Sequence, residues 1–281
     1  VVQDEEVVGE GWHERAGEAH AEIHALSVAG NRAKGAEVFV SLEPCAHTGR
    51  TGPCVTALIE AGVKRVVAAM VDPNPQVAGK GLEMLNSAGI VAQVSQDDCG
   101  AAELNAGFCR RVVGGRPLVR LKVAATLDGR TAANDGSSKW ITGEEARADV
   151  HQLRASSCAL VTGIGTVRED DPRLNARIDR QVVQPLRVVL DGNGQLDPEA
   201  RLFSEPGDIL IVTSREDDEG FDFDARTEQI CLAGADGRVD VAGVLDLLAE
   251  RSCNEVLVEA GAGVAGAFVS RGLVDELWVY Q

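Results

Sequence analysis

Val38-Phe39-Val40-Ser41-Leu42-Glu43-Pro44-Cys45 is an apolar run that ends in a proline and a cysteine. Its β-branched and aromatic residues predict a buried strand over residues 38–42. Cys45 would then lie at the carboxyl end of that strand. Cys54 follows after eight intervening residues and is predicted to begin a helix. Alternating strands and helices of this kind predict an α/β fold, with two thiols at a strand end and a helix start.

A histidine and a glutamate precede this stretch as His20-Ala21-Glu22. One imidazole and two thiolates are typical zinc ligands that leave a fourth position open. A carboxylate beside that open position is a candidate proton carrier. Zinc lowers the pKa of a bound water, and the carboxylate can move the proton toward leaving ammonia. We therefore expect His20, Cys45 and Cys54 to bind zinc and Glu22 to be catalytic in a hydrolytic deamination.

Two simpler interpretations compete with this one. The cysteines could be ordinary core thiols, and a histidine two residues before a glutamate occurs by chance. The ligands could also hold a purely structural zinc, but such a site usually has a fourth protein ligand. The order His-Glu-Cys-Cys, with Pro44 before the first cysteine, is more specific and favours a catalytic metal.

Composition limits the class of protein. The 281 residues suffice for two domains, and 44% of them are hydrophobic. No apolar run is long enough to span a membrane, and the first residues do not resemble a signal peptide. Seven scattered cysteines do not suggest a disulfide framework and fit a reducing cytoplasm. The net charge of −17 argues against nucleic acid as a partner.

The chain has two halves that join near Gly114-Gly115-Arg116-Pro117, the clearest linker signal. In the first half we expect a hairpin of residues 1–2 and 7–12, helices over 20–33, 55–61, 76–88 and 103–113, and strands over 38–42, 65–71 and 90–94. In the second half we expect strands over 118–124, 159–162, 186–191, 209–213, 256–259 and 277–280, and helices over 143–155, 239–251 and 263–270.

The motifs of the first half resemble the deaminase part of the bifunctional riboflavin-biosynthesis deaminase/reductase family. The resemblance rests on His20-Ala-Glu-Ile-His24-Ala-Leu and on Glu43-Pro-Cys45-Ala-His47-Thr-Gly-Arg50-Thr51-Gly-Pro-Cys54. Most cytidine deaminases keep only two to four residues between the cysteines, whereas eight are typical of the riboflavin branch. Asp72-Pro-Asn-Pro-Gln-Val-Ala-Gly79-Lys-Gly81 is similar to the family as well.

The second half resembles the reductase part of the same family in three places. These are Lys122-Val-Ala-Ala-Thr-Leu-Asp128-Gly-Arg-Thr131 with Ser138-Lys-Trp140-Ile-Thr142, residues 161–174, and Val258-Glu259-Ala-Gly261-Ala-Gly263-Val-Ala-Gly266. The resemblance implies a cytidine-deaminase-like α/β/α domain over residues 1–115, followed by a dihydrofolate-reductase-like α/β domain over residues 116–281. Family members usually carry further residues before the first hairpin and after the last strand, so we expect this chain to be a fragment trimmed at both ends.

The resemblance implies the substrate 2,5-diamino-6-ribosylamino-4(3H)-pyrimidinone 5′-phosphate, which is deaminated at the 2-amino carbon and then reduced at the ribosyl C1′. His47, Arg50 and Thr51, between the two cysteines, are expected to contact the pyrimidine or its phosphate. His24 lies one helical turn past His20, where it either supports the metal site or merely fills space.

Hydride transfer to C1′ requires a nicotinamide cofactor, and we expect NADPH. Gly261-Ala-Gly263-Val-Ala-Gly266 is predicted to follow a strand and open a helix, where amides can meet a pyrophosphate. Cofactor contacts are expected at Ala124, Trp140, Thr166, Asp170, Gly192, Gly261, Ala262, Gly263, Val264, Ala265, Gly266 and Ala267. Substrate contacts are expected at Lys122, Ser138, Arg154, Leu174, Arg177 and Glu259.

Three of these expectations have a physical reason of their own. The guanidinium groups of Arg154 and Arg177 suit a phosphate through charge-assisted bidentate bonds, although surface arginines are usually just solvated. Lys122 lies in an apolar run, where a charge is costly unless it is paired, so we expect an active-site role. Ser214-Arg215, after a strand, is a hypothetical site for the 2′-phosphate of the cofactor.

Two rival functions remain open at this point. One is a nucleoside deaminase or a tRNA-editing zinc deaminase with an accessory α/β domain, which would share the pocket chemistry. The acidic charge, the long loop between the cysteines and the reductase-like half argue against it. The other is a zinc-stabilised scaffold without activity, which the intact His-Glu-Cys-Cys set disfavours. We expect a cytoplasmic homo-oligomer that acts on a phosphorylated pyrimidine and contacts neither nucleic acid nor membrane.

Overall fold

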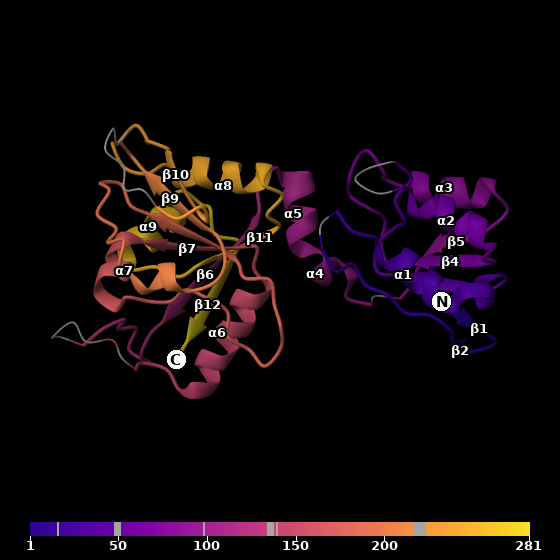
Figure 1. Cartoon of the computed structure of the whole chain (residues 1–281), viewed down its shortest axis with the longest axis horizontal. Helices are drawn as coiled ribbons and strands as arrows, with labels where there is room; N and C mark the ends of the chain where they lie inside the picture. The colour runs from indigo at the N-terminus through magenta and orange to yellow at the C-terminus, as the bar shows by residue number, and fades with distance from the viewer. Residues whose placement is uncertain (16, 48–51, 98, 134–137, 139, 216–222) are drawn as a thin grey trace. The chain divides into compact units, whose positions relative to one another are not determined.

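A computed structural model describes residues 1–281 except residues 16, 48–51, 98, 134–137, 139 and 216–222. The chain divides into two compact units, Val1–Val113 and Gly114–Gln281. Each unit is an α/β structure built around its own sheet (Figure 1). The α/β fold class that the sequence predicts is therefore confirmed.

The first unit contains a five-stranded sheet in the order β2-β1-β3-β4-β5. The strands β3, β4 and β5 run parallel, while β1 pairs antiparallel with both β2 and β3. Its strands are β1 (Val2–Gln3), β2 (Glu6–Val7), β3 (Glu37–Val40), β4 (Arg65–Ala68) and β5 (Val91–Val94). Its helices are α1 (Ala21–Ala29), α2 (Cys54–Ala61), α3 (Lys80–Ser87), α4 (Ala101–Leu104) and α5 (Ala106–Gly114), with a 3₁₀ turn over Gly30–Ala33.

Apolar side chains from β3, β4 and three helices form the core of this unit. Val66 of β4 is fully buried, as are Leu58 of α2 and Leu85 of α3. The helix α2 packs against both α1 and α3, so the three helices share this core. The first residue of α2 is Cys54, which the core therefore holds in place.

The strand that the sequence predicts over residues 7–12 is wrong beyond Val7. Residues 8–12 instead run along helix α1, and two glycines permit the close approach. A Cβ atom on Gly9 would lie 2.2 Å from the carbonyl oxygen of Ala25, and one on Gly11 would lie 2.5 Å from that of Ala21. Contact with the helix thus takes the place of strand pairing.

The second unit contains a seven-stranded sheet in the order β10-β9-β8-β7-β11-β6-β12 (Figure 1). Every neighbouring pair is parallel. Its strands are β6 (Leu118–Ala124), β7 (Ala159–Gly163), β8 (Leu186–Leu190), β9 (Ile209–Thr213), β10 (Thr227–Cys231), β11 (Glu255–Val258) and β12 (Glu276–Tyr280). Its helices are α6 (Glu144–Ser156), α7 (Ile164–Asp170), α8 (Val241–Glu250) and α9 (Ala262–Ser270), with a 3₁₀ turn over Arg201–Ser204.

Helices cover both faces of this sheet, and alternation along the strands shows which face each covers. Val161 of β7 lies in one core with residues of α8 and with Phe268 of α9. The neighbouring Leu160 packs on the opposite face with Leu153 of α6. On that same opposite face, Val189 of β8 packs with Val167 of α7. A strand covered on both faces buries every side chain, so its sequence is a continuous apolar run, as in β7 and β9.

The sequence did not predict the strand β10 or the helix α7, and it predicted one helix where the structure has two. The edge strand β10 is mostly exposed, so it lacks the apolar signal of the central strands. The helix α7 is short and contains Gly165 near its start. The helix expected over residues 103–113 is two helices, α4 and α5, separated at Asn105.

No helix among the described residues is long and apolar enough to cross a membrane.

Replacing Phe268 with alanine should lower the free energy of unfolding of the second unit by about 3–5 kcal/mol, because a fully buried ring is removed and a cavity remains. Val269, its neighbour on α9, is 59% exposed, and Val269→Ala should change this free energy by less than about 0.5 kcal/mol. Hydrogen exchange of the amides of β6 and β11 in urea provides the measurement. Equal protection in the two variants would contradict the assigned packing.

Candidate functional site

The three predicted metal ligands come from three elements that meet at one edge of the first sheet. His20 precedes the first turn of α1, and its carbonyl oxygen accepts the amides of Ile23 and His24. Cys45 follows β3, and Cys54 is the first residue of α2. The strand end and the two helix starts therefore bring together residues that lie up to 34 positions apart.

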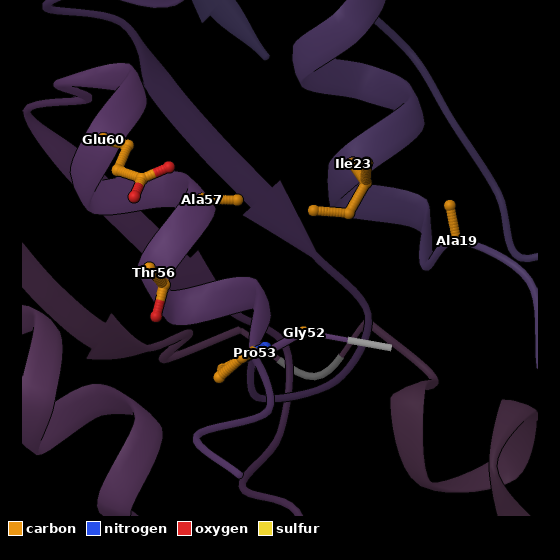
Figure 2. A pocket seen from close by; sticks show the side chains of 7 residues that line it. All are labelled: Ala19, Ile23, Gly52, Pro53, Thr56, Ala57 and Glu60. Carbon is orange, nitrogen blue, oxygen red and sulfur yellow. The ribbon is translucent and has the colours of Figure 1, made fainter. Parts of the chain in front are cut away.

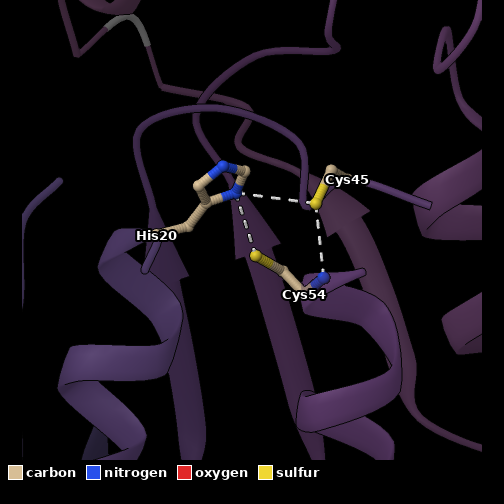
Figure 3. Close-up of side chains that lie close together, drawn as sticks. All are labelled: His20, Cys45 and Cys54. Atoms are coloured by element: carbon tan, nitrogen blue, oxygen red, sulfur yellow. Dashed lines mark hydrogen bonds between the residues drawn. The ribbon is translucent and has the colours of Figure 1, made fainter. Parts of the chain in front are cut away.

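The geometry of this triad fits zinc. His20 Nδ1 lies 3.6 Å from Cys45 Sγ and 3.2 Å from Cys54 Sγ, and all three ligand atoms lie within 4.8 Å of one another (Figure 3). Tetrahedral zinc with ordinary bond lengths separates such nitrogen and sulfur atoms by about 3.6 Å. Among the described residues this is the only group of three or more such side chains close enough to share a metal. Three protein ligands are typical of a catalytic site.

The pKa values of the two thiols, Cys45 and Cys54, are shifted in opposite directions. The hydrogen bond between them, together with the Cys54 amide and His20, lowers the pKa of Cys45 to about 5. The same hydrogen bond and burial raise the pKa of Cys54. The Cys54 amide donates to Cys45 Sγ over 3.3 Å, which places this sulfur at the N-terminus of α2. A bound metal would deprotonate both thiols, because coordination requires the thiolate.

Glu22 lies in the first turn of α1 and is 9% exposed. Burial raises its pKa above that of a free carboxyl, and its side chain contacts the Cys54 thiol. A carboxyl whose pKa moves toward neutrality can exchange protons near neutral pH. Its position beside a candidate metal ligand is the one a proton carrier needs.

The other histidines near the triad differ in their surroundings. The ring of His13 packs edge-on against that of His20, with centroids 5.3 Å apart, a contact that the sequence did not suggest. His24 Nε2 is buried, and among the described residues it has no hydrogen-bond partner. His47 is exposed on the loop after Cys45. Arg50 and Thr51 lie outside the described residues.

A shallow recess opens between α1 and α2 beside two of the three ligands (Figure 2). Ala19 and Pro53 directly precede His20 and Cys54. The lining is largely apolar, with Thr56 and Glu60 as its polar side chains, so we assign no polar ligand to it. The lining residues are Ala19, Ile23, Gly52, Pro53, Thr56, Ala57 and Glu60.

A second cluster forms at the carboxyl edge of the second sheet, around Glu259. Arg154 of α6 donates to both carboxylate oxygens of Glu259, over 2.6 Å and 2.9 Å. Lys122 Nζ of β6 lies 3.7 Å from the same carboxylate. Burial opposes ionisation of Glu259, but the two cations outweigh it and lower its pKa. The half-buried lysine is thus paired, as its place in an apolar strand requires.

His151 and Asn175 extend this cluster, and the sequence did not identify either. The Arg177 guanidinium donates to Asn175 Oδ1 and lies 3.0 Å from His151 Nε2. Burial, followed by Arg154 and Arg177, lowers the pKa of His151 to about 4. His151 precedes Arg154 by three positions on α6, a spacing that places both on one helix face and could have revealed it.

The residues expected to contact the cofactor follow neighbouring strands at the same carboxyl edge. The Gly261 amide, at the start of α9, donates to Thr166 Oγ1 of α7 over 3.2 Å. Ser214 Oγ donates to the carbonyl oxygen of Gly192 over 2.9 Å, which joins the ends of β8 and β9. Ala124 ends β6, Asp170 ends α7, and residues 262–267 form the first turns of α9.

The other residues predicted to contact substrate or cofactor do not take part in the hydrogen bonds described above. Ser138 is exposed, and Trp140 is 73% exposed with the Arg147 guanidinium 4.6 Å above its ring. Leu174 is buried and adopts a positive φ of 56°, which turns the chain before Asn175. The carbonyl oxygen of Arg215 accepts the Thr213 hydroxyl.

Both halves of the chain match known families. The profile of the cytidine and deoxycytidylate deaminase zinc-binding region matches residues 1–70, and that of the RibD C-terminal domain matches residues 117–281. The riboflavin biosynthesis protein RibD of Escherichia coli is 46% identical over 292 residues, covering all of this chain and 79% of that protein. The RibD protein of Bacillus amyloliquefaciens is 42% identical, covering all of this chain and 76% of its own length.

Solved structures agree with this result. RibD of Acinetobacter baumannii has a TM-score of 0.86 at 43% identity, covering 98% of this chain and 77% of that one. A diaminohydroxyphosphoribosylaminopyrimidine deaminase/5-amino-6-(5-phosphoribosylamino)uracil reductase from Thermotoga maritima has a TM-score of 0.86 at 34% identity, covering 99% of this chain and 77% of that one.

Replacing Cys54 with serine should remove zinc from the protein, because the triad would lose a thiolate ligand. Metal content per chain, measured by atomic emission after dialysis, provides the test. Cys231→Ser, at an exposed thiol of the second unit, is the matched control and should retain zinc. Equal zinc content in the two variants would contradict the assigned ligand set.

The low pKa of His151 predicts a stability that depends on pH. The folded protein keeps this imidazole neutral down to pH of about 4, whereas the unfolded chain binds a proton near pH 6.5. The unfolded state therefore gains protons first as pH falls, so the contribution of His151 is present above about pH 6.5 and is lost toward pH 4. His151→Gln should flatten the fall in melting temperature over this range. An NMR titration of His151 with a midpoint near 6.5 would refute the prediction.

Proposed function

The chain belongs to the RibD family of riboflavin biosynthesis proteins, and from this premise we infer how its residues divide the chemistry between two sites. It is a bifunctional enzyme of riboflavin biosynthesis, with a zinc-dependent deaminase in its first half and a reductase in its second. Its substrate is a phosphorylated pyrimidine, and its cofactors are zinc and NADPH.

The observation that carries the deaminase assignment is the triad of His20, Cys45 and Cys54 with buried Glu22 beside it. Zinc held by this triad would acidify a bound water and so supply the nucleophile for the ring carbon that carries the amino group. We propose that Glu22 accepts one proton of the water and delivers it to a ring nitrogen. It then moves the second proton, from the hydroxyl on the reacting carbon, to the amino group, which leaves as ammonia. Its raised pKa favours a carboxyl that both takes and returns a proton.

We propose that His47, Arg50 and Thr51 contact the pyrimidine or its phosphate. They belong to the loop between the two cysteines, and His47, the one that the structure describes, is exposed beside Cys45 and so is free to meet a ligand. We propose that His24 fills space rather than supports the metal site, because its Cβ atom packs against the segment that contains Gly11.

In the reductase we propose that Gly192, Gly261, Thr166 and the start of α9 hold the cofactor. The amides at the N-terminus of α9 suit a pyrophosphate. NADPH held there would supply the hydride for C1′ of the ribosyl group. The other proposed contacts are Ala124, Trp140, Asp170 and residues 262–267, with Ser214 and Arg215 toward the 2′-phosphate.

The substrate of the reductase would lie at the neighbouring strand ends, near Lys122 and Glu259. Arg154 is committed to Glu259, so it acts through that carboxylate rather than as a separate phosphate ligand. Arg177 is the better phosphate contact. Burial and then the charges of Arg154 and Arg173 lower its pKa, and a phosphate would offset both effects. Ser138 and Leu174 complete the proposed substrate set.

The nucleoside and tRNA-editing alternatives are disfavoured, because matches to the riboflavin family extend over all of the chain. We also propose that the protein excludes nucleic acid, since its net charge is −17. We propose that the enzyme acts in the cytoplasm as a homo-oligomer. Its seven scattered cysteines are consistent with a reducing compartment, in which thiolates stay available to bind zinc.

Glu22→Gln should reduce ammonia release from the diaminopyrimidine substrate by about 10²–10⁴-fold, because an amide cannot carry the proton. Zinc content should stay at the wild-type level. Oxidation of NADPH with the deaminated intermediate as substrate should also be unchanged, since that chemistry belongs to the other unit. Undiminished ammonia release by the zinc-loaded variant would refute the role of Glu22.

A further inference from the structure

Glu43 is a buried carboxylate that gathers four backbone amides. It is 3% exposed and lies two residues before Cys45. Its Oε2 accepts the amides of Asp72 and Gly79, over 3.1 Å and 2.9 Å. Its Oε1 accepts those of Gly81 and Leu82, over 2.8 Å and 3.3 Å. A carboxylate this deeply buried is costly unless such donors satisfy it.

The four donors belong to one segment, residues 72–82, which leads from β4 into helix α3. Gly81 and Leu82 lie in the first turn of α3, where amides have no partner within the helix. A negative charge at this helix end is favourable. Glu43, in the loop that follows β3, therefore caps α3 and at the same time holds the start of the segment at Asp72.

This segment lies at the same edge of the sheet as the metal ligands. The strands β3 and β4 are parallel neighbours, and they lead to Cys45 and to Asp72 respectively. Asp72 is buried, and its pKa is raised first by burial, with Cys45 and His47 close enough to influence it. The segment therefore faces Cys45 and the loop that carries His47.

The segment over residues 72–82 packs closely against Glu43 and Pro44, the two residues before Cys45. A Cβ atom on Gly81 would lie 2.1 Å from the carbonyl oxygen of Pro44 and 3.0 Å from Glu43 Oε1. Gly81 thus allows the segment to pack directly against Glu43-Pro44-Cys45. A displacement of the segment would change the wall of the site beside the metal ligand.

We propose that Glu43 is a positioning residue for the deaminase, which fixes residues 72–82 as a wall of the pyrimidine pocket next to Cys45. The proposal rests on the deaminase function proposed above. It assigns to Glu43 no contact with substrate or metal. Glu43 acts through the four amides, so its loss should weaken pyrimidine binding while zinc and the proton carrier Glu22 stay in place.

Glu43→Gln in the full chain tests this, because the amide nitrogen of glutamine would face two donors that the carboxylate now accepts. The KM of ammonia release should rise about tenfold or more with kcat within about twofold, the pattern of lost binding shared by ground and transition states. Zinc content and NADPH oxidation with the deaminated intermediate should match the wild type. Hydrogen exchange of the amides in residues 72–82 should accelerate.

Two further variants separate positioning from general damage. Gly81→Ala pushes the same segment away from Pro44 and should reproduce the rise in KM. Glu37→Gln, at the other end of β3, removes a carboxylate that pairs with Arg65 and Lys64 at the surface, and it should leave KM unchanged.

An unchanged KM in Glu43→Gln would overturn the proposal, as would a loss of zinc in proportion to the loss of activity. A wild-type chain that binds the pyrimidine without releasing ammonia would instead contradict the deaminase function. In that case the dissociation constants of the wild type and Glu43→Gln for the pyrimidine decide the role of Glu43, and equal values overturn it.

Discussion

Parallel strands end at a common edge, and both candidate sites depend on this constraint. In the first unit β3 and β4 deliver Cys45 and Asp72 to one edge, where the starts of α1 and α2 add His20 and Cys54. In the second unit the ends of β8, β7, β11 and β6 bring Gly192, Thr166, Gly261 and Lys122 to one edge. The ladder of backbone hydrogen bonds sets the order of these strands, so it also sets which side chains become neighbours.

Burial of charge is the second principle that both units share. Three buried ionic groups, Glu43, Glu259 and Arg187, have partners that offset their loss of solvation. Glu43 has four amides, and Glu259 has Arg154 and Lys122. Arg187, fully buried on β8, donates to the carbonyl oxygens of Leu202, Glu205 and Gly207. Burial also raises the pKa of Glu22, which supports the role of proton carrier that we propose for it.

Much of the site could be predicted from the sequence, because few residue types bind zinc and their order along the chain is restrictive. The sequence predicts His20, Glu22, Cys45 and Cys54 in this way, and the structure brings the three predicted ligands together. Lys122 was singled out because a charge in an apolar strand needs a partner, and it lies 3.7 Å from Glu259. That Glu259 pairs with both cations was not predictable, since it lies 105 positions from Arg154 and still further from Lys122. The segment over residues 8–12 was mistaken for a strand, because its alternating pattern does not reveal that Gly9 and Gly11 allow it to lie against α1.

The sequence by itself determined the fold class, the family and the chemistry of the metal site, because ligand type, spacing and hydrophobic pattern are local properties of the chain. Only the tertiary structure decided that Glu43 caps α3 and holds residues 72–82 beside Cys45. Only the tertiary structure showed that Arg154 is occupied by Glu259 while burial and neighbouring arginines lower the pKa of Arg177. These contacts depend on which strands pair and which helices cover them, and no local pattern encodes the distance between two elements once the chain has folded.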